Sequence, residues 1–447
     1  MRRYFGTDGV RGTVNKAPMT AEFSLALGRA AGHVLTRHLD HKPHILIGKD
    51  TRLSGYMIES ALCAGLTAQG MNVLLVGPVP TPAVAYLTRS LRADAGVMLS
   101  ASHNPAGDNG IKFFAADGFK LPDEVEFEIE ACLDALPPLP PALEIGKAAR
   151  VDDARGRYIE FLKGSLPKGL RLDGLKVVVD CANGAAYDVA PRILHELGCN
   201  VIAMHAEPDG YNINRECGST YPEHMMRRVV ESGADVGLAL DGDADRLIAC
   251  DQKGQIIDGD RVIAILAEHA NCHGQLSGSG VVTTLMSNMG LERYLGSMGL
   301  EMFRADVGDR YVLEMMRDKG CNIGGEQSGH MILLDHNTTG DGLMTALQLL
   351  TAMTEQQKPL SDMAAGMELF PQKLWNIVMP ERRDVLADTQ VQALVRDAEE
   401  RLGGEGRINV RMSGTEPKLR IMVEASDEEL MLSIGEPLVQ AISARVC

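Results

Sequence analysis

The chain has 447 residues, of which 45% are hydrophobic and 23% charged, a composition ordinary for a soluble globular protein of roughly two to four domains. Its net charge of −16 argues against a nucleic-acid partner, which normally requires a basic face, but not against small anions held by a local group of Arg and Lys. Nine scattered cysteines without a Cys-x-x-Cys pair, no secretory signal and no long apolar run predict a cytoplasmic protein with reduced thiols and no membrane contact.

Strand and helix patterns alternate over residues 1–153, which predicts a mostly parallel sheet with helices on both faces. The predicted elements are, in chain order, a helix over 20–39, a strand over 44–47, a helix over 54–68, a strand over 72–76, a helix over 81–91 and a strand over 96–99. A proline-rich connector over 136–141 lies near the end of this first domain.

The same alternation recurs over residues 154–258 and 259–370, which predicts a second and a third domain of similar α/β construction on mixed sheets. In the second domain we expect a helix over 154–162, a strand over 176–179, a helix ending at 195, a strand over 200–204, a helix over 223–232 and a strand over 235–240. In the third we expect helices over 260–269, 291–299, 311–319 and 340–354, and strands over 280–285, 301–304 and 331–334.

Residues 371–447 have a different pattern, in which strands are separated by a short loop. The predicted strands cover 373–379, 407–412 and 418–424, and the predicted helices cover 391–402 and 428–445. Strands that pair across a loop form an antiparallel sheet, so a smaller α+β domain is expected at the C-terminus.

The first motif with chemical meaning is the loop after the strand over 96–99. Small polar residues there lead to Asn104-Pro105, which ends regular structure, so Ser102 should lie on a tight loop at the carboxyl end of a strand. Ligands bind at that edge in open α/β sheets, and a hydroxyl held there is a candidate covalent acceptor. The alternative is a loop serine that caps a turn.

The second motif is DGDADR over residues 241–246, with carboxylates at Asp241, Asp243 and Asp245. Oxygen ligands at alternate positions favour a hard cation such as Mg²⁺, Ca²⁺ or Mn²⁺. A calcium EF-hand is excluded, because Arg246 and Gln252 stand where that loop requires glycine and glutamate. A solvated acidic turn is disfavoured, since three like charges this close repel one another unless a cation lies among them.

The third and fourth motifs are turns that contain glycine. Glu326 and Ser328 project from GGEQSGH over 324–330, where they suit the hydroxyls or amino group of a sugar, although a purely structural turn fits the pattern equally well. In RMSGTEP over 411–417, Arg411 and the loop donors, with Arg420 beyond, predict a phosphate site, the alternative being a surface turn with incidental basic residues.

Further candidates are single polar residues near these loops. Lys112 could balance the charge of a phosphoryl group or move a proton, whereas His103 is a poor base for Ser102 because the two are adjacent in sequence. The remaining candidates are Arg11, Lys49 and His330. An acceptor hydroxyl, a divalent cation and positioning groups are the parts that phosphoryl transfer needs, and no Walker A or kinase motif indicates a nucleotide donor.

These four motifs, with FGTDGVRG over residues 5–12, occur in the order and spacing of the α-D-phosphohexomutase superfamily, which the chain resembles over its whole length. The resemblance implies four domains around a central cleft, with boundaries at 1–153, 154–258, 259–370 and 371–447. The GEQSG form of the third motif is similar to that of members acting on glucosamine phosphates, and other members usually differ at Gln327.

The resemblance also implies roles for individual residues. Ser102 is expected to be a phosphoserine that, with Asp241, Asp243 and Asp245, holds one Mg²⁺ per chain. Glu326 and Ser328 would bind sugar hydroxyls. The distal phosphate would be bound by Arg411, Ser413, Gly414, Thr415 and Arg420. Arg11, Lys112, Arg246 and His330 would line the cleft, with Lys112 and His330 as candidates for proton transfer.

The implied reaction interconverts glucosamine 6-phosphate and glucosamine 1-phosphate through a sugar bisphosphate and supplies UDP-N-acetylglucosamine synthesis. Glucosamine 1,6-bisphosphate would be the activator and a small phosphosugar the only partner, while the sequence leaves a homodimer open. Because water must be kept from the phosphoserine, the last domain is expected to close over the cleft. The alternatives are a general hexomutase for glucose or mannose phosphates, a metal-dependent sugar phosphatase and a non-catalytic sugar-phosphate sensor.

Overall fold

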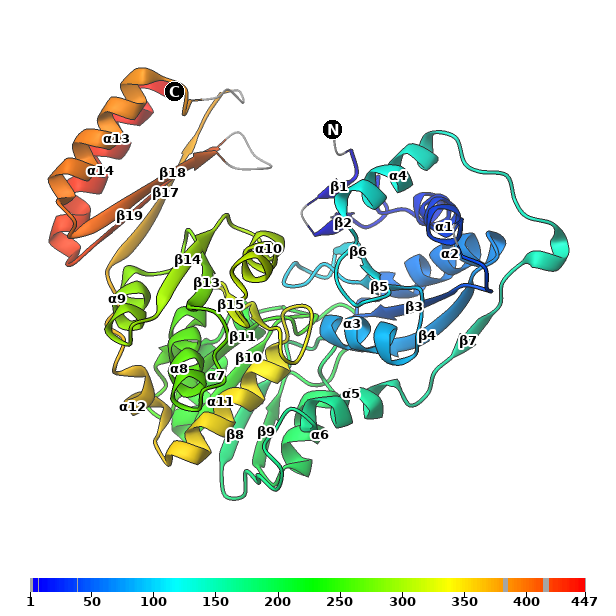
Figure 1. The fold of residues 1–447 in the computed structure, drawn as a ribbon, viewed down its shortest axis with the longest axis horizontal. Coiled ribbons are helices and arrows are strands. Elements are labelled where there is room, and N and C mark those ends of the chain that lie inside the picture. Colours follow the sequence, from blue (N-terminus) through cyan, green and yellow to red (C-terminus); the bar gives the residue numbers. More distant parts are fainter. Residues whose placement is uncertain (1–2, 7, 38, 381–384, 413–417, 447) are drawn as a thin grey trace.

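The computed structural model describes residues 3–6, 8–37, 39–380, 385–412 and 418–446. Four sheets follow one another along the chain, and we call each sheet with the helices around it a unit (Figure 1). Among the described residues, no helix has the length and apolar character needed to span a bilayer. The expected α/β class, with three similar mixed-sheet units and a smaller α+β unit, is confirmed.

The first unit is built on a seven-stranded sheet of order β1-β2-β6-β5-β3-β4-β7. Its strands are β1 (Phe5–Gly6), β2 (Gly9–Thr13), β3 (His44–Lys49), β4 (Asn72–Pro78), β5 (Ala95–Leu99), β6 (Asp108–Ala115) and β7 (Ala148–Arg150). Its helices are α1 (Ala21–Thr36), α2 (Ser54–Ala68), α3 (Thr81–Ser90) and α4 (Asp123–Asp134). The central strands are parallel, as expected, but β6 returns antiparallel to β5 and pairs with β2 on its other edge.

The second and third units have mixed sheets of order β12-β11-β10-β8-β9 and β14-β13-β15-β16. The second contains α5 (Ala154–Lys163), β8 (Lys176–Asp180), α6 (Val189–Glu196), β9 (Asn200–Met204), α7 (Glu223–Ser232), β10 (Val236–Leu240), β11 (Leu247–Asp251) and β12 (Ile256–Ile257). The third contains α8 (Gly259–Cys272), β13 (Gly280–Thr284), α9 (Met289–Ser297), β14 (Glu301–Ala305), α10 (Asp309–Lys319), β15 (Ile323–Gly325), β16 (Met331–Leu333), α11 (Gly342–Gln356) and α12 (Leu360–Ala364). In the second, β11 runs antiparallel to both β10 and β12, and in the third β16 runs antiparallel to β15.

The fourth unit is a three-stranded antiparallel sheet covered by two helices. Its elements are β17 (Gln372–Val378), α13 (Thr389–Leu402), β18 (Gly406–Met412), β19 (Lys418–Ala425) and α14 (Glu428–Val446). It has an apolar cluster of its own, whereas one continuous cluster joins α3 of the first unit, β8 of the second and α11 of the third. The first three units therefore share a core, and the fourth is attached to them (Figure 1).

Hydrogen bonds from an ion-paired arginine and glutamate anchor the fourth unit to the third. The Arg407 Nε donates to the buried Glu424 carboxylate at 2.6 Å, and the Arg407 Nη1 donates to the carbonyl of Leu285 at 2.7 Å. The Met289 N–H donates to the other oxygen of Glu424 at 2.7 Å. These contacts fix one end of the β18–β19 hairpin on the third unit.

The buried carboxylate of Asp341 links the second and third units, and its shifted pKa should make the stability of the protein depend on pH. Tyr158 on α5 donates to Asp341, which caps α11, and burial raises the pKa of Asp341 to about 6. Because the folded pKa lies above the unfolded value, the native state holds this proton more tightly, and stability falls as the pH rises from about 4 to 6. Asp341→Asn should remove up to about 3 kcal/mol of this dependence, measured as the difference in urea unfolding between pH 4 and 7. Equal slopes for wild type and variant would contradict the prediction.

Candidate functional site

Ser102 lies where the sequence predicts it, on the loop that follows β5. Its backbone has a φ of +50°, a left-handed conformation that is strained for a serine, and its side chain is buried. The Ser102 Oγ donates to the Asp241 Oδ2 at 2.5 Å, so the serine loop of the first unit meets the aspartate loop of the second. Gly242 permits this approach, because a Cβ there would lie 2.6 Å from the Ser102 carbonyl oxygen.

Two residues that the sequence did not single out hold the serine loop in place. The fully buried Arg52 donates to the carbonyls of Ser102 and Asn104 at 2.9 and 2.8 Å, and pairs with Asp50 at 2.8 Å. Asn214 of the second unit donates to the Ser102 carbonyl at 2.8 Å. The contacts fix the strained backbone from both sides.

The three carboxylates of Asp241, Asp243 and Asp245, here called the aspartate triplet, converge as predicted. They are buried and offer oxygens within 4.8 Å of one another. Burial and the two neighbouring charges raise the pKa of Asp241 well above its ordinary value. One oxygen each of Asp243 and Asp245 is buried without a hydrogen-bond partner among the described residues, so the donor set fits a hard cation.

Lys112 is positioned by β6 and lies against the aspartate triplet. Its Nζ is 2.9 Å from Asp243, 3.1 Å from Asp8 and 3.6 Å from Asp245. Burial alone would lower the pKa of Lys112, but these carboxylates outweigh it and raise that pKa. These carboxylates therefore favour the ammonium form of Lys112.

Lys112 belongs to a closed ring of alternating charges, which we call the charge ring. Its members, in order, are Lys112, Asp8, Lys120, Asp309, His330 and Asp245. Neighbouring charged atoms lie 2.5 to 3.6 Å apart. Burial would lower the pKa of His330, but Asp245, Asp309 and Glu326 raise it to about 9. The sequence predicted Lys112, His330 and Asp245 but did not single out Asp8, Lys120 and Asp309, whose roles come from contacts with residues far along the chain.

The ring of His103 lies close to the hydroxyl of the neighbouring Ser102. Its Nδ1 is 3.4 Å from the Ser102 Oγ, at the long end of hydrogen-bond distances. Burial, together with the charges of Arg246 and Arg11, lowers the pKa of His103 to about 4. The ring is therefore neutral at physiological pH.

The third motif is joined to the second by backbone pairing. Arg246 and His330 form an antiparallel bridge, and the Leu247 N–H donates to the Gly329 carbonyl at 3.0 Å. Glu326 accepts the Gly308 N–H at 3.1 Å, so its carboxylate lies at the start of α10. The Ser328 hydroxyl is 3.5 Å from the same carboxylate. The two residues predicted to bind a sugar therefore lie side by side.

The fourth motif places two arginines face to face. Arg411 and Arg420 are directly opposite each other on β18 and β19, and burial and the charge of Arg420 lower the pKa of Arg411. Like charges in this arrangement repel, and both Nε atoms lack a hydrogen-bond partner among the described residues. A bound dianion would reduce the repulsion between the two guanidiniums and accept hydrogen bonds from their Nε atoms. Ser413, Gly414 and Thr415 lie outside the described residues.

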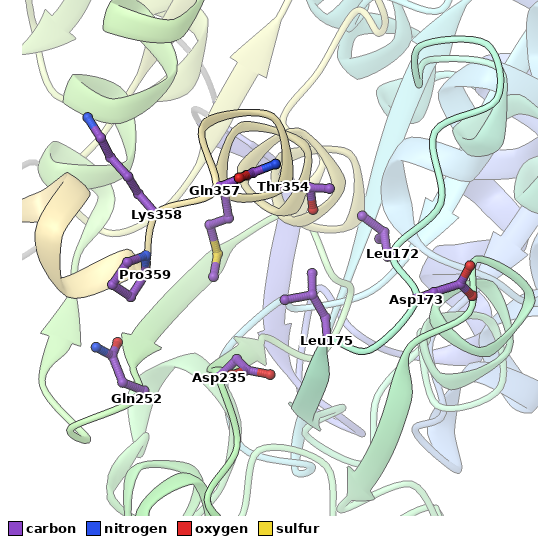
Figure 2. Close-up of a pocket in the computed structure, with 10 residues that line it drawn as sticks. Leu172, Asp173, Leu175, Asp235, Gln252, Thr354, Gln357, Lys358 and Pro359 are labelled. Carbon is purple, nitrogen blue, oxygen red and sulfur yellow. The ribbon is translucent and has the colours of Figure 1, made fainter.

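A cleft of about 1050 Å³ lies between the units. The predicted site residues that line it are Arg11, Ser102, Asp245, Arg246, Glu326, His330 and Arg420. Lys49 is not among them, because it is buried against Glu59 at 2.5 Å and beneath the ring of Tyr56. A separate cavity of about 320 Å³, lined by Leu175, Gln252 and Gln357, contains no predicted site residue (Figure 2). The chemistry therefore belongs to the larger cleft.

Models of four domains of one family match successive parts of the chain. The phosphoglucomutase/phosphomannomutase α/β/α domains I, II and III match residues 2–138, 156–254 and 258–370, and the C-terminal domain matches residues 374–440. The chain belongs to the phosphoglucomutase/phosphomannomutase family. The resemblance inferred from the four motifs is confirmed.

Relatives within the family are similar along almost the entire chain. The phosphoglucosamine mutase of Magnetococcus marinus is 56% identical over 443 residues, which cover 99% of this chain and 92% of that protein. That of Paracoccus denitrificans is 55% identical and covers 99% of both chains. These relatives match the expectation drawn from the GEQSG motif.

Solved structures of the family share the fold. A phosphoglucomutase/phosphomannomutase family protein of Burkholderia thailandensis superposes with a TM-score of 0.81 at 24% identity, covering 98% of this chain and 97% of that one. Aspergillus fumigatus N-acetylphosphoglucosamine mutase, solved in complex with GlcNAc-6P and magnesium, superposes with a TM-score of 0.68 at 17% identity, covering 100% and 96%.

Replacing Arg52 tests whether it maintains the serine loop. Arg52→Met should destabilise the protein by about 3–5 kcal/mol in urea unfolding, because it leaves the charge of the buried Asp50 uncompensated and removes the hydrogen bonds from Arg52 to the serine loop. Asp50→Asn combined with Arg52→Met should recover part of the loss, since the uncompensated charge is then gone. A loss below about 1 kcal/mol would contradict this role.

Proposed function

We propose that this protein interconverts glucosamine 6-phosphate and glucosamine 1-phosphate. The observation that carries the proposal is the contact between Ser102 and Asp241 at 2.5 Å, within a cleft that also contains Glu326 and Arg420. An acceptor hydroxyl, a cation site and groups for a phosphosugar thus lie in one pocket. The relatives named phosphoglucosamine mutase support the choice of amino sugar.

In the proposed reaction, phospho-Ser102 gives its phosphoryl group to the free hydroxyl of the bound sugar phosphate. The serine P–O bond breaks as the new sugar P–O bond forms. The sugar hydroxyl gives its proton to a group in the cleft, and the departing Ser102 Oγ takes up a proton. The sugar bisphosphate then turns end for end, and Ser102 takes the other phosphate. The same arginines must therefore bind either phosphate, which suits Arg411 and Arg420, whose guanidiniums recognise phosphate rather than sugar.

The aspartate triplet, together with an oxygen of the phosphoserine, would hold one Mg²⁺, which supplies charge neutralisation for the transferring phosphoryl group. Lys112, a fixed cation against the triplet, balances charge there. His330, with a pKa raised to about 9 and an Nε2 that lacks a hydrogen-bond partner among the described residues, is suited to donate a proton. Arg11 and Arg246 line the cleft beside the serine.

The remaining assignments belong to the same proposal. Glu326 and Ser328 bind sugar hydroxyls, and Arg411, Ser413, Gly414, Thr415 and Arg420 bind the distal phosphate. Domain boundaries at 153/154, 258/259 and 370/371 agree with the separation of the four sheets. Glucosamine 1,6-bisphosphate acts as activator, the protein works in the cytoplasm, and a homodimer is one arrangement to test by light scattering.

Intact mass measurement tests the covalent step. The protein purified without phosphatase treatment should contain a fraction carrying one phosphoryl group, mapped to Ser102, and Ser102→Ala should lose both the adduct and turnover. Ser60→Ala serves as a folded control, because it removes an exposed hydroxyl of α2, which donates to the Tyr56 carbonyl at 2.8 Å, and leaves Ser102 in place. An unmodified Ser102 that does not become phosphorylated by sugar bisphosphate would rule out the mechanism.

Substrate competition tests the choice of sugar. After priming with a trace of bisphosphate, kcat/KM for glucosamine 6-phosphate should exceed that for glucose or mannose phosphate by orders of magnitude. Comparable values would indicate a general hexomutase, and net release of inorganic phosphate would indicate a phosphatase.

A further inference from the structure

Two histidines and a glutamate converge on the surface of the third unit, away from the cleft. His269 and His273 lie four residues apart at the C-terminal end of α8, so their rings project from one face of the helix. Glu355 comes from the last turn of α11, which packs against α8. We call these three residues the His–Glu cluster, and none of them lines the cleft.

The distances in the His–Glu cluster suit coordination of one ion. The Glu355 Oε2 lies 2.9 Å from the Nε2 of His269 and 3.8 Å from the Nε2 of His273. One ligand atom from each of the three residues lies within 4.8 Å of the others. Ligands about 2.0–2.2 Å from a tetrahedral ion are roughly 3.4 Å apart, so a small adjustment of the side chains would complete the geometry.

A hydrogen bond from the Nδ1 of His273 leaves its Nε2 available to bind a metal ion. Its Nδ1 is 2.7 Å from the carbonyl oxygen of His269, and because a carbonyl can only accept, Nδ1 carries the proton. The lone pair is then on Nε2, the atom that points towards Glu355. A backbone carbonyl that fixes the far nitrogen of a ligating imidazole is a typical outer contact in protein metal sites.

We propose that the His–Glu cluster is a second metal site, for Zn²⁺, distinct from the magnesium site proposed for the aspartate triplet. Two imidazoles and a carboxylate are ligands that Zn²⁺ favours, whereas Mg²⁺ prefers oxygen alone. The ion is bound by the Nε2 of both histidines, one oxygen of Glu355 and a water molecule. In the proposed site, His269 binds the ion as the tautomer with its proton on Nδ1. The site joins the C-terminal ends of α8 and α11.

The side chains of a third group also converge but are less suited to bind a metal ion; they belong to Asp180, His205 and Cys217. Both oxygens of Asp180 already accept hydrogen bonds, one from the Ala182 N–H at 2.9 Å and one from the His205 ring at 2.9 Å. Burial and the charge of Asp180 raise the pKa of Cys217 to about 12, which keeps the thiol protonated. The His–Glu cluster is therefore the stronger candidate.

Calorimetric titration of the metal-stripped, full-length protein tests the proposal. With Mg²⁺ in large excess to fill the aspartate triplet, wild type should bind one Zn²⁺ per chain, and His269→Gln and His273→Gln should each weaken that binding at least about tenfold. Co²⁺ should give the visible absorption of a tetrahedral site in wild type and lose it in both variants. Mutase activity with Mg²⁺ should be unchanged in His273→Gln.

The matched control is His195→Gln, which removes another exposed histidine from the last turn of a helix and should leave Zn²⁺ binding unchanged. Equal melting temperatures in EDTA would establish that the variants are folded. Binding of Zn²⁺ by His273→Gln with wild-type affinity and stoichiometry, or no binding by wild type, would overturn the proposal.

Discussion

Three buried carboxylates within 4.8 Å of one another are the constraint on which the arrangement of the cleft depends. Their mutual repulsion must be offset by positive charge, and Arg246 of the second unit, which carries them, supplies part of it. Lys112 comes from the first unit and His330 from the third, and the charge ring links both to the aspartate triplet. The charges that compensate the aspartate triplet therefore come from different units, and the cleft lies where these units meet.

The serine loop illustrates a division between rigid and adaptable parts. Ser102 is held in a strained conformation by Arg52 and Asn214, both of which bind its carbonyl and leave its hydroxyl towards the cleft. Arg411 and Arg420, which we propose bind phosphate, are on the fourth unit, which has its own core and contacts the third through Arg407 and Glu424. The proposed acceptor is therefore held in place, while the groups proposed to bind the far end of the substrate belong to a separately packed unit.

The sequence predicted the parts of the site that depend on local pattern. Ser102 and the aspartate triplet follow apolar strands and are marked by spacing, so they could be located without coordinates. Strands β6 and β11 were missed because each is a return strand in a loop rich in glycine and charge, and its pairing depends on a distant neighbour. Arg52, Asn214 and Lys120 were missed for a related reason: their roles come from contacts with residues far along the chain.

The β18–β19 hairpin has its attachment and its binding groups at opposite ends. Arg407 and Glu424 fasten it to the third unit, and Arg411 and Arg420 are four residues farther along their strands, about 14 Å away at the rise of an antiparallel strand. If the fourth unit rotated by about 10° about this attachment, the guanidiniums would move by roughly 2 Å. That travel is close to the difference between a direct and a water-separated contact with an oxyanion.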